Sequence, residues 1–355
     1  MKKVLVTGGC GFIGSNTSLA LLEKGYELLI VDSFVNSYPI VINKIKNLFF
    51  EKYVKKTNKI KLINCDLKDR DSLEKAFEES NKDGNKISAV IHFAGLKAVS
   101  DSLLDPLSYW TSNVLGTVNL LNVMEKFECR TLVFSSSATI YGTNNSKENL
   151  KENHYKNPLN PYGMTKETIE KILNNLNNVE KNDWRIAILR YFNPIGAHTA
   201  GELGESPKNT PNNIMPIINS VALGKRGYLN IFGNNWNTPD GTPIRDYIHV
   251  MDLADGHIKA LEYLCKNSKP NLITLNLGTG IGKSVLQLIN IFEEVNKISI
   301  PYRFASRRAG DIEYSVADNS MAKQLLNWEP HKDIKAMCKD SWNWVSKNPN
   351  GYSNR

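Results

Sequence analysis

Three side chains in the middle of the chain have the types and spacing needed to move a proton. Tyr162 and Lys166 are four residues apart, so a helix would place them on one face. A tyrosine, with a pKa of about 10, is a poor base at neutral pH, but a neighbouring lysine cation favours the phenolate and lowers that pKa. Ser137 ends an apolar strand pattern and can hydrogen-bond an oxygen that changes between alcohol and ketone. We predict that these three residues are catalytic.

A glycine-rich turn near the N-terminus predicts a dinucleotide site. Residues 7–14 read Thr-Gly-Gly-Cys-Gly-Phe-Ile-Gly between a strand pattern and a helical pattern. Gly8 permits the turn, Gly11 lets the backbone approach a pyrophosphate, and Gly14 allows close helix–sheet packing. The next strand pattern ends in Asp32, whose carboxylate can accept from both ribose hydroxyls and would repel a 2′-phosphate. The carboxylate of Asp32 favours NAD over NADP. The glycine turn together with the candidate catalytic residues favours hydride transfer over a merely structural turn. The positive nicotinamide ring of NAD would add to the lysine's lowering of the tyrosine pKa.

Further candidate contacts lie where later strand patterns end, because a doubly wound sheet binds its ligand at that edge. Asp66 and Leu67 follow the third strand pattern and can reach an adenine. Small residues after the fourth strand leave room for the dinucleotide, and the lysine there can meet a phosphate or ribose or lie on the surface. This segment contains Phe93, Ala94, Gly95 and Lys97.

The elements that must position these residues alternate through the first half of the chain. Strand patterns cover 4–7, 27–32, 61–65, 89–93, 131–135 and 185–191. Helical patterns cover 13–24, 41–55, 73–79, 109–126 and 166–177. Strand and helix in regular order predict an α/β fold with a doubly wound parallel sheet of the Rossmann type.

Prolines and glycines interrupt the pattern after residue 193, which indicates a second, smaller α/β domain. We predict a cofactor-binding domain over 1–190 and a substrate-binding domain over 191–355. Strand patterns recur at 247–250 and 273–277, and we expect the stretch 247–277 to cross back to the first sheet.

Composition excludes several other classes. The chain has 355 residues and a net charge of +8. Between 41 and 61, seven lysines face the single acid Glu51, and the aromatic residues there do not alternate with arginine; a solvated helix face is favoured over a nucleic-acid site. Neither the five cysteines nor the histidines have metal-ligand spacing. The N-terminal apolar run is too short for a signal peptide, and no apolar stretch spans a bilayer. We expect a cytoplasmic protein without a metal, nucleic-acid or membrane partner.

These motifs together resemble the UDP-hexose 4-epimerases of the extended short-chain dehydrogenase/reductase family. The resemblance extends over nearly the whole chain. It rests on the segments Gly8–Gly14, His92–Val99, Phe134–Gly142, Pro161–Gly163, Arg190–Pro194, Pro211–Asn213, Asp240–Thr242, Arg245–Val250, Asn276–Gly280 and Arg307–Asp311. Family members usually have other residues at Phe12, Asn16 and Ser33, which bears on cofactor affinity and not on the reaction.

The resemblance implies roles residue by residue. It agrees with Ser137, Tyr162 and Lys166 as catalytic residues. The cofactor contacts that it implies or supports are Gly11, Phe12, Ile13, Asp32, Ser33, Ser37, Asp66, Leu67, Phe93, Lys97, Asn113 and Phe192, with Tyr162 and Lys166. The nucleotide-sugar contacts are Ser137, Tyr162, Asn193, Asn213, Ile214, Asn230, Phe232, Arg245, Arg308, Asp311 and Ser315. Two arginines suit a diphosphate, a phenylalanine can stack on uracil, and an aspartate can hold a ribose hydroxyl; an ion pair of Arg245 with Asp246 is the structural alternative.

The implied activity is NAD-dependent 4-epimerisation of UDP-glucose and UDP-galactose through a 4-keto intermediate, in a homodimer formed by the helices over 109–126 and 166–177. Ser315 stands where a tyrosine would confine the sugar pocket, so we expect UDP-N-acetylglucosamine and UDP-N-acetylgalactosamine to be substrates too. The rivals are a nucleotide-sugar 4,6-dehydratase, a nucleotide-sugar decarboxylase or another extended short-chain reductase. A dehydratase would carry an Asp-Glu pair where this chain has Ala138 and Thr139. A non-catalytic NAD-binding regulator is a further alternative, although it would be expected to lose Tyr162 or Lys166.

Overall fold

The computed structural model describes residues 2–54, 59–82, 84–143, 147–179, 183–267, 269–308 and 310–352. Lys55 and Lys56 of the basic segment, and Ala309 of the Arg307–Asp311 motif, lie outside these ranges. Within them, every helix is too short or too polar to cross a membrane.

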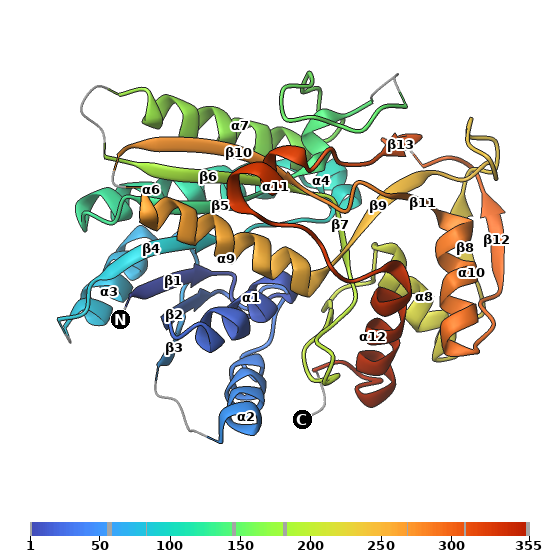
Figure 1. Ribbon diagram of the computed structural model, residues 1–355, viewed down its shortest axis with the longest axis horizontal. Coiled ribbons are helices and arrows are strands. Elements are labelled where there is room, and N and C mark those ends of the chain that lie inside the picture. The colour runs from blue at the N-terminus through green and yellow to red at the C-terminus, as the bar shows by residue number, and fades with distance from the viewer. Residues whose placement is uncertain are drawn as a thin grey trace.

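A seven-stranded parallel sheet forms the larger half of the molecule, as predicted (Figure 1). Its strand order is β10-β6-β5-β4-β1-β2-β3, and all six neighbouring pairs are parallel. The strands are β1 (Lys3–Thr7), β2 (Glu27–Asp32), β3 (Ile60–Asn64), β4 (Ile87–His92), β5 (Thr131–Ser137), β6 (Arg185–Tyr191) and β10 (Asn271–Leu277). The order reverses beside β1, where an open α/β sheet binds its ligand.

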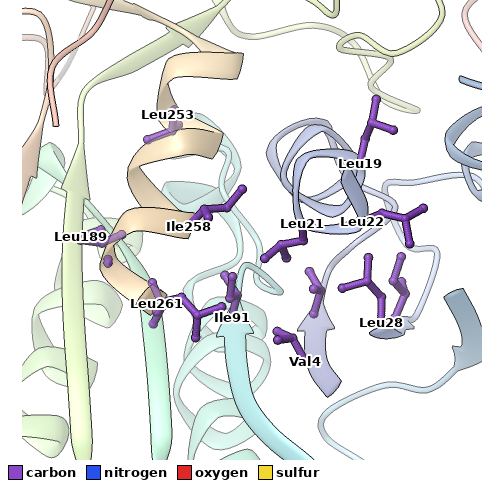
Figure 2. Packing of buried hydrophobic residues seen from close by; sticks show 14 of the residues in the cluster. Val4, Leu19, Leu21, Leu22, Leu28, Ile91, Leu189, Leu253, Ile258 and Leu261 are labelled. Atoms are coloured by element: carbon purple, nitrogen blue, oxygen red, sulfur yellow. The ribbon is translucent and has the colours of Figure 1, made fainter. Parts of the chain in front are cut away.

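Helices cover both faces of this sheet because alternate strand residues point to opposite sides. One face packs against α1 (Phe12–Glu23), α2 (Val41–Tyr53) and α9 (Val250–Lys266). Figure 2 shows Leu21 of α1 and Ile258 and Leu261 of α9 near Val4 and Ile91 of the strands. The other face packs against α3 (Arg70–Asn81), α6 (Gly116–Lys126) and α7 (Pro161–Asn177). The two apolar layers fix the positions of the strand ends.

The C-terminal part forms smaller sheets at the right of Figure 1. β9 (Ile244–His249) pairs with β7 (Asn193–Ile195), β11 (Gly282–Ser284) and β13 (Tyr314–Ser315), and β8 (Leu229–Phe232) pairs with β12 (Tyr302–Ala305). The surrounding helices are α8 (Ile214–Ala222), α10 (Val285–Asn296) and α12 (Ile334–Lys347), and α11 (Ser320–Leu326) lies against β10.

The strand expected to cross back at 247–250 belongs instead to the smaller sheet, so that expectation was wrong for this strand. β10 occupies the edge beside β6, and β9 pairs with β7 instead. Neighbouring side chains of β9 face two cores: Tyr247 packs in the C-terminal core and Ile248 in the core beneath α9. The chain returns to the large sheet through α9 and β10, and α11 then packs against β10.

The single helix predicted over 109–126 is three helical segments in the structure. α5 (Pro106–Tyr109) follows α4 (Val99–Leu104) and leads into a π-helix, η1 (Trp110–Leu115), before α6 begins. The wider turn of a π-helix shifts which residues face inward, and Asn113 is buried there. Hydrophobic periodicity cannot reveal such a turn, because one extra residue leaves the apolar pattern on either side intact.

Charges of the basic segment lie on the surface of α2 and β3. Lys44 pairs with Glu202, Lys52 with Glu23, and Lys61 with Glu79. The opposite side of α2 buries Val41, Ile42, Ile45 and Leu48.

Candidate active site

A cleft of about 550 Å³ lies at the carboxyl ends of the central strands and runs from the glycine-rich turn to Tyr162 and Lys166. It therefore joins the two motifs that the sequence predicted separately. Of the predicted cofactor residues, it is lined by Gly8, Gly11, Phe12, Ile13, Gly14, Asp32, Ser33, Ser37, Asp66, Leu67, Phe93, Ala94, Gly95, Lys97, Tyr162 and Lys166.

The turn between β1 and α1 has room for a ligand because glycine occupies its crowded positions. Gly8 has a φ of +67°, which other residues rarely adopt. A Cβ added at Gly14 would lie 2.2 Å from the carbonyl oxygen of Gly8, so any side chain there would break the turn. The start of α1 at Phe12 directs free backbone N–H groups and the positive end of the helix dipole at the cleft, a suitable site for a pyrophosphate.

Asp32 ends β2 with its carboxylate held by three protein groups. One oxygen accepts from the backbone N–H of Cys10 at 2.9 Å, and the other accepts from the N–H of Phe34 at 3.0 Å and from the hydroxyl of Ser37 at 2.6 Å. These bonds orient the carboxylate and tie the glycine-rich turn to the loop after β2. Asp32 and Ser37 both line the cleft.

Tyr162 and Lys166 are placed by the first turns of α7. Asn160 caps the helix by accepting from the N–H of Gly163 at 2.9 Å, and Pro161 takes the first helical position, where its missing N–H costs nothing. The Lys166 ammonium donates to the carbonyl of Ser135 at 2.8 Å and lies 6.0 Å from the centre of the Tyr162 ring. Both side chains are buried at the end of the cleft.

Ser137, the last residue of β5, hydrogen-bonds Tyr162. Its oxygen also accepts from the Thr139 backbone at 3.2 Å and from the Thr139 hydroxyl at 3.0 Å. Because these two contacts use the lone pairs of the Ser137 oxygen, its own proton is available for donation. Ser137 can therefore donate to the phenol oxygen or to a substrate oxygen.

Burial dominates the titration of the tyrosine–lysine pair. It raises the pKa of Tyr162 to about 12, against the lowering effect of the Ser137 hydrogen bond. The sequence predicts that the lysine lowers this pKa; in the structure desolvation is the larger effect, and the lowering contribution comes from Ser137. Burial also lowers the pKa of Lys166 to about 8, against the raising effect of Glu170.

Among the other predicted cofactor contacts, Lys97 and Asn113 bind protein groups, and Phe192 is not a lining residue of the cleft. Lys97 forms a 2.9 Å ion pair with Glu205. The Asn113 side chain accepts from the N–H of Leu96 at 2.8 Å and donates to its carbonyl at 3.1 Å, so it braces the loop after β4. Phe192 is buried in a small apolar cluster beside the end of β5.

Several predicted nucleotide-sugar residues gather in the C-terminal part. The Arg308 guanidinium lies 5.3 Å from the Phe232 ring centre and 2.9 Å from the Asp311 carboxylate. Arg245 lies 3.9 Å from the same carboxylate. The alternative was an ion pair of Arg245 with Asp246. The Asp246 carboxylate instead accepts hydrogen bonds from Thr279, Gly280 and Ala317.

The other predicted substrate residues are distributed around this group. Ser315 pairs with Arg245 in the register of β13 and β9, while the Tyr314 hydroxyl donates to Asn149 at 2.9 Å. Asn213 donates to Glu205 at 3.0 Å. Asn193 begins β7, Ile214 begins α8, and Asn230 lies in β8.

Several lining residues were not predicted from the sequence, including residues of the loop after β2 and of α5 and η1. Tyr191 ends β6 opposite Ser137 in the strand register, and strand ends could have indicated it. Glu205, Ser206 and Pro207 also line the cleft, but they come from an irregular loop that carries no periodic signal.

The comparisons with known proteins agree with this geometry. The fold and the glycine-lined cleft define a dinucleotide-binding α/β protein, and residues 5–341 match the family model described as GDP-mannose 4,6 dehydratase. UDP-glucose 4-epimerase 2 of Arabidopsis thaliana is 47% identical over 99% of this chain and 97% of that protein. UDP-glucose 4-epimerase of Bacillus subtilis is 46% identical over 98% of each chain.

A solved structure gives the same result. The crystal structure of UDP-glucose 4-epimerase from Bifidobacterium longum in complex with NAD+ and UDP is 41% identical and superposes with a TM-score of 0.90, covering 99% of this chain and 100% of that one. The chain belongs to the UDP-glucose 4-epimerase family.

Proposed function

We propose that this protein is an NAD-dependent UDP-hexose 4-epimerase, an isomerase that interconverts UDP-glucose and UDP-galactose. The observation that carries the proposal is the single cleft that runs from the glycine-rich turn to Tyr162 and Lys166. A base at the end of a dinucleotide groove is the arrangement that hydride transfer at a carbinol carbon needs. The names of the relatives, which are 46–47% identical over nearly the full chain, support the same activity.

The residues of the cleft fit NAD. The turn around Gly8 and Gly14 leaves no space for a Cβ, and the start of α1 suits the pyrophosphate. Asp32 suits two ribose hydroxyls and disfavours a 2′-phosphate. When bound, NAD supplies an acceptor for the C4 hydride and returns that hydride in the second half of the cycle.

Tyr162 is the base that removes the proton of the C4 hydroxyl and later returns it. Lys166 is the neighbouring cation that favours the phenolate, whereas burial disfavours it and raises the pKa of Tyr162 to about 12. Ser137 holds the oxygen that changes between alcohol and ketone. Because Thr139 donates to the Ser137 oxygen, the Ser137 proton, which is donated to Tyr162 in the free protein, is the one that binds the substrate oxygen.

The C-terminal residues hold the UDP part. Arg245 and Arg308 share the carboxylate of Asp311 and can both turn toward a diphosphate. Phe232 offers a face to uracil. Because binding energy comes from the nucleotide, the 4-keto sugar is free to turn and present its other face to the returning hydride.

The sugar range follows from Ser315. This small, buried residue is paired with Arg245 across the strands, and a serine takes up less room beside the sugar than a tyrosine would. UDP-N-acetylglucosamine and UDP-N-acetylgalactosamine are therefore further substrates. The hydroxyl of the neighbouring Tyr314 donates to Asn149.

The domain division at residues 190 and 191 is part of the same proposal, with α9 and β10 returning to the first domain. A cytoplasmic location is proposed because each of the five cysteines is a free thiol, as expected in a reducing compartment.

The assembly proposed is a homodimer. Leu104 of α4 is 86% exposed and Leu107 of α5 is 76% exposed, and α4, α5 and η1 all contact α7. A second copy would cover these leucines, so Leu104→Asp with Leu107→Asp should convert a dimer into a monomer in analytical ultracentrifugation. A wild-type protein that sediments as a monomer at micromolar concentration would rule out the dimer.

The test of the activity is incubation of the purified protein with NAD and UDP-glucose, with products separated by chromatography. We expect an equilibrium mixture with UDP-galactose and no net change in NAD. A 4-keto-6-deoxy product would instead indicate the rival dehydratase, although Ala138 and Thr139 provide no acid–base pair for it. Binding of NAD without any turnover would indicate a regulator.

A further inference from the structure

α7 carries a third buried polar residue in line with the proposed base and its lysine. Glu170 lies four residues after Lys166 and eight after Tyr162, on the helix face that packs against the sheet. Its side chain is 1% exposed. A buried carboxylate is costly unless it is paired and hydrogen-bonded, so its partners indicate its role.

Arg190 of β6 binds this carboxylate through both branches of its guanidinium. Nε donates to one oxygen of Glu170 at 2.9 Å and Nη2 to the other at 2.7 Å. The remaining Nη1 donates to the Tyr141 hydroxyl at 3.0 Å and to the Glu152 carbonyl at 2.8 Å. Arg190 is thus locked on several sides, and the carboxylate cannot rotate without breaking the two-point contact.

Three successive residues of β5 each contact one of the three α7 side chains. The Ser135 carbonyl accepts from Lys166, the Ser136 hydroxyl donates to Glu170 at 2.6 Å, and Ser137 hydrogen-bonds Tyr162. A slip of α7 along β5 would break all three contacts together. These three contacts together therefore fix the position of Tyr162 relative to the carboxyl end of β5.

The Lys166 ammonium is buried. It donates to the neutral carbonyl of Ser135 and lies 4.8 Å from the centre of the Phe134 ring, and neither group is an anion. Glu170 is the anion that raises the Lys166 pKa against the effect of burial. Other titratable or charged groups lie near these three side chains of α7. His92 of β4 lies near Lys166, and His257 of α9 binds Ser135, whose carbonyl accepts from Lys166. Tyr109 of α5 and Tyr191 of β6 lie near Tyr162, and Arg190 of β6 and Lys156 pair with Glu170.

We propose that Glu170 is a positioning residue for the reaction: its carboxylate, fixed by Arg190, keeps the Lys166 ammonium charged and holds α7 in register with β5. The inference rests on the proposed function, in which a charged Lys166 supports the Tyr162 phenolate. Glu170 itself touches neither the substrate nor the cofactor. It acts through the lysine.

The test measures the titration of Lys166 directly. The NAD-bound protein is labelled with ¹³Cε-lysine, and the Lys166 NMR signal is identified by its loss in Lys166→Met. Glu170→Gln should lower the Lys166 pKa by about one unit or more. The decline of kcat on the alkaline side should move to lower pH by the same amount, with KM for UDP-glucose unchanged.

Two further variants keep the test decisive if Glu170→Gln, which leaves Arg190 buried without its partner, does not fold. The double variant Glu170→Gln with Arg190→Met removes both charges and should show the same lowered Lys166 pKa. Arg190→Lys is the matched control, because it disturbs the same contact but retains the Glu170 charge, and it should leave the Lys166 pKa near the wild-type value.

An unchanged Lys166 pKa in the folded Glu170 variants would overturn the inference, as would an equal shift in Arg190→Lys. These results are independent of the proposed function: the NMR titration can be read even from a protein without turnover. Absence of epimerisation in the wild type would instead count against the function.

Discussion

The Lys166 ammonium lies 6.0 Å from the centre of the Tyr162 ring and points its hydrogen bond at the carbonyl of Ser135, 2.8 Å away. Lysine and tyrosine thus interact through charge, while the serine backbone fixes the lysine. Burial raises the pKa of Tyr162 to about 12 and lowers that of Lys166 to about 8. Lys166 can therefore stabilise the Tyr162 phenolate only while the lysine keeps its proton.

Replacing the lysine should make the base harder to ionise. In Lys166→Met the Tyr162 phenolate loses its neighbouring cation, so the rise of kcat with pH should move to higher pH by about one unit or more. Lys171→Met, on the exposed side of α7 where Lys171 pairs with Glu167, is the control and should retain the wild-type profile. A profile of kcat against pH decides the matter, and an unmoved profile in Lys166→Met counts against the role of the lysine.

Replacing Asp32 should change cofactor choice. Asp32→Ala removes the carboxylate that repels a 2′-phosphate, so NADP binding should improve relative to NAD by roughly ten- to a hundredfold. Asp32→Asn is the matched variant. It removes the charge, but its amide oxygen can still accept a hydrogen bond from the backbone N–H of Cys10 or of Phe34, the two groups that Asp32 binds.

Calorimetric titration of the cofactor-free variants with NAD and with NADP measures both affinities. If Asp32→Asn shows the same relative gain for NADP as Asp32→Ala, charge is the cause. A wild-type protein that prefers NADP would show that our interpretation of Asp32 is wrong.

Enlarging Ser315 should exclude the acetamido sugars alone. Ser315→Tyr fills the space beside Arg245, so kcat/KM for UDP-N-acetylglucosamine should fall by about a hundredfold or more, whereas UDP-glucose should be nearly unaffected. Ser315→Ala is the control and should accept both. Equal losses on both substrates in Ser315→Tyr would show that the position is structural.

Two buried histidines should make folding sensitive to acid. Burial lowers the pKa of His92 to about 3 and that of His257 to about 4, so both remain neutral in the folded protein while the unfolded chain binds protons below pH 6.5. Stability is therefore full above about pH 6.5 and falls as pH drops toward these folded-state values. The loss is about 1.4 kcal/mol per pH unit for each histidine.

Urea unfolding between pH 7 and pH 5 measures this slope. His257→Gln, which can keep a bond to Ser135, should have a smaller slope than the wild type by about one proton. Identical slopes in both proteins would mean that His257 does not titrate as the structure indicates.

The parallel sheet and the cofactor turn were predictable from sequence because their signals are local. Val4–Thr7 and Glu27–Asp32 are apolar strands bounded by turns, and Gly8 and Gly14 have a spacing that only a few backbone conformations require. The spacing of Tyr162 and Lys166 likewise indicated one helix face. In each case the residues concerned are neighbours along the chain.

What the sequence could not give depends on contacts between distant segments. The π-turn that buries Asn113 is one wide turn between two stretches that each keep a helical pattern, so the pattern predicts a continuous helix. The loop of Glu205, Ser206 and Pro207 lines the cleft together with residues that are distant in the sequence, such as Asp32 and Ser37. The Glu170–Arg190 pair joins a helix to a strand that lies 20 residues away, and the rise of the Tyr162 pKa follows from burial that no local pattern reports.

The most direct measurement is the turnover of Tyr162→Phe. This variant lacks the phenol oxygen that removes the C4 hydroxyl proton, but it keeps the ring packing, including the edge contact with Tyr109. The account predicts a folded protein that binds NAD like the wild type and whose kcat for UDP-glucose is lower by about 10²- to 10⁴-fold. Turnover within a few-fold of the wild type, with NAD bound, would contradict it.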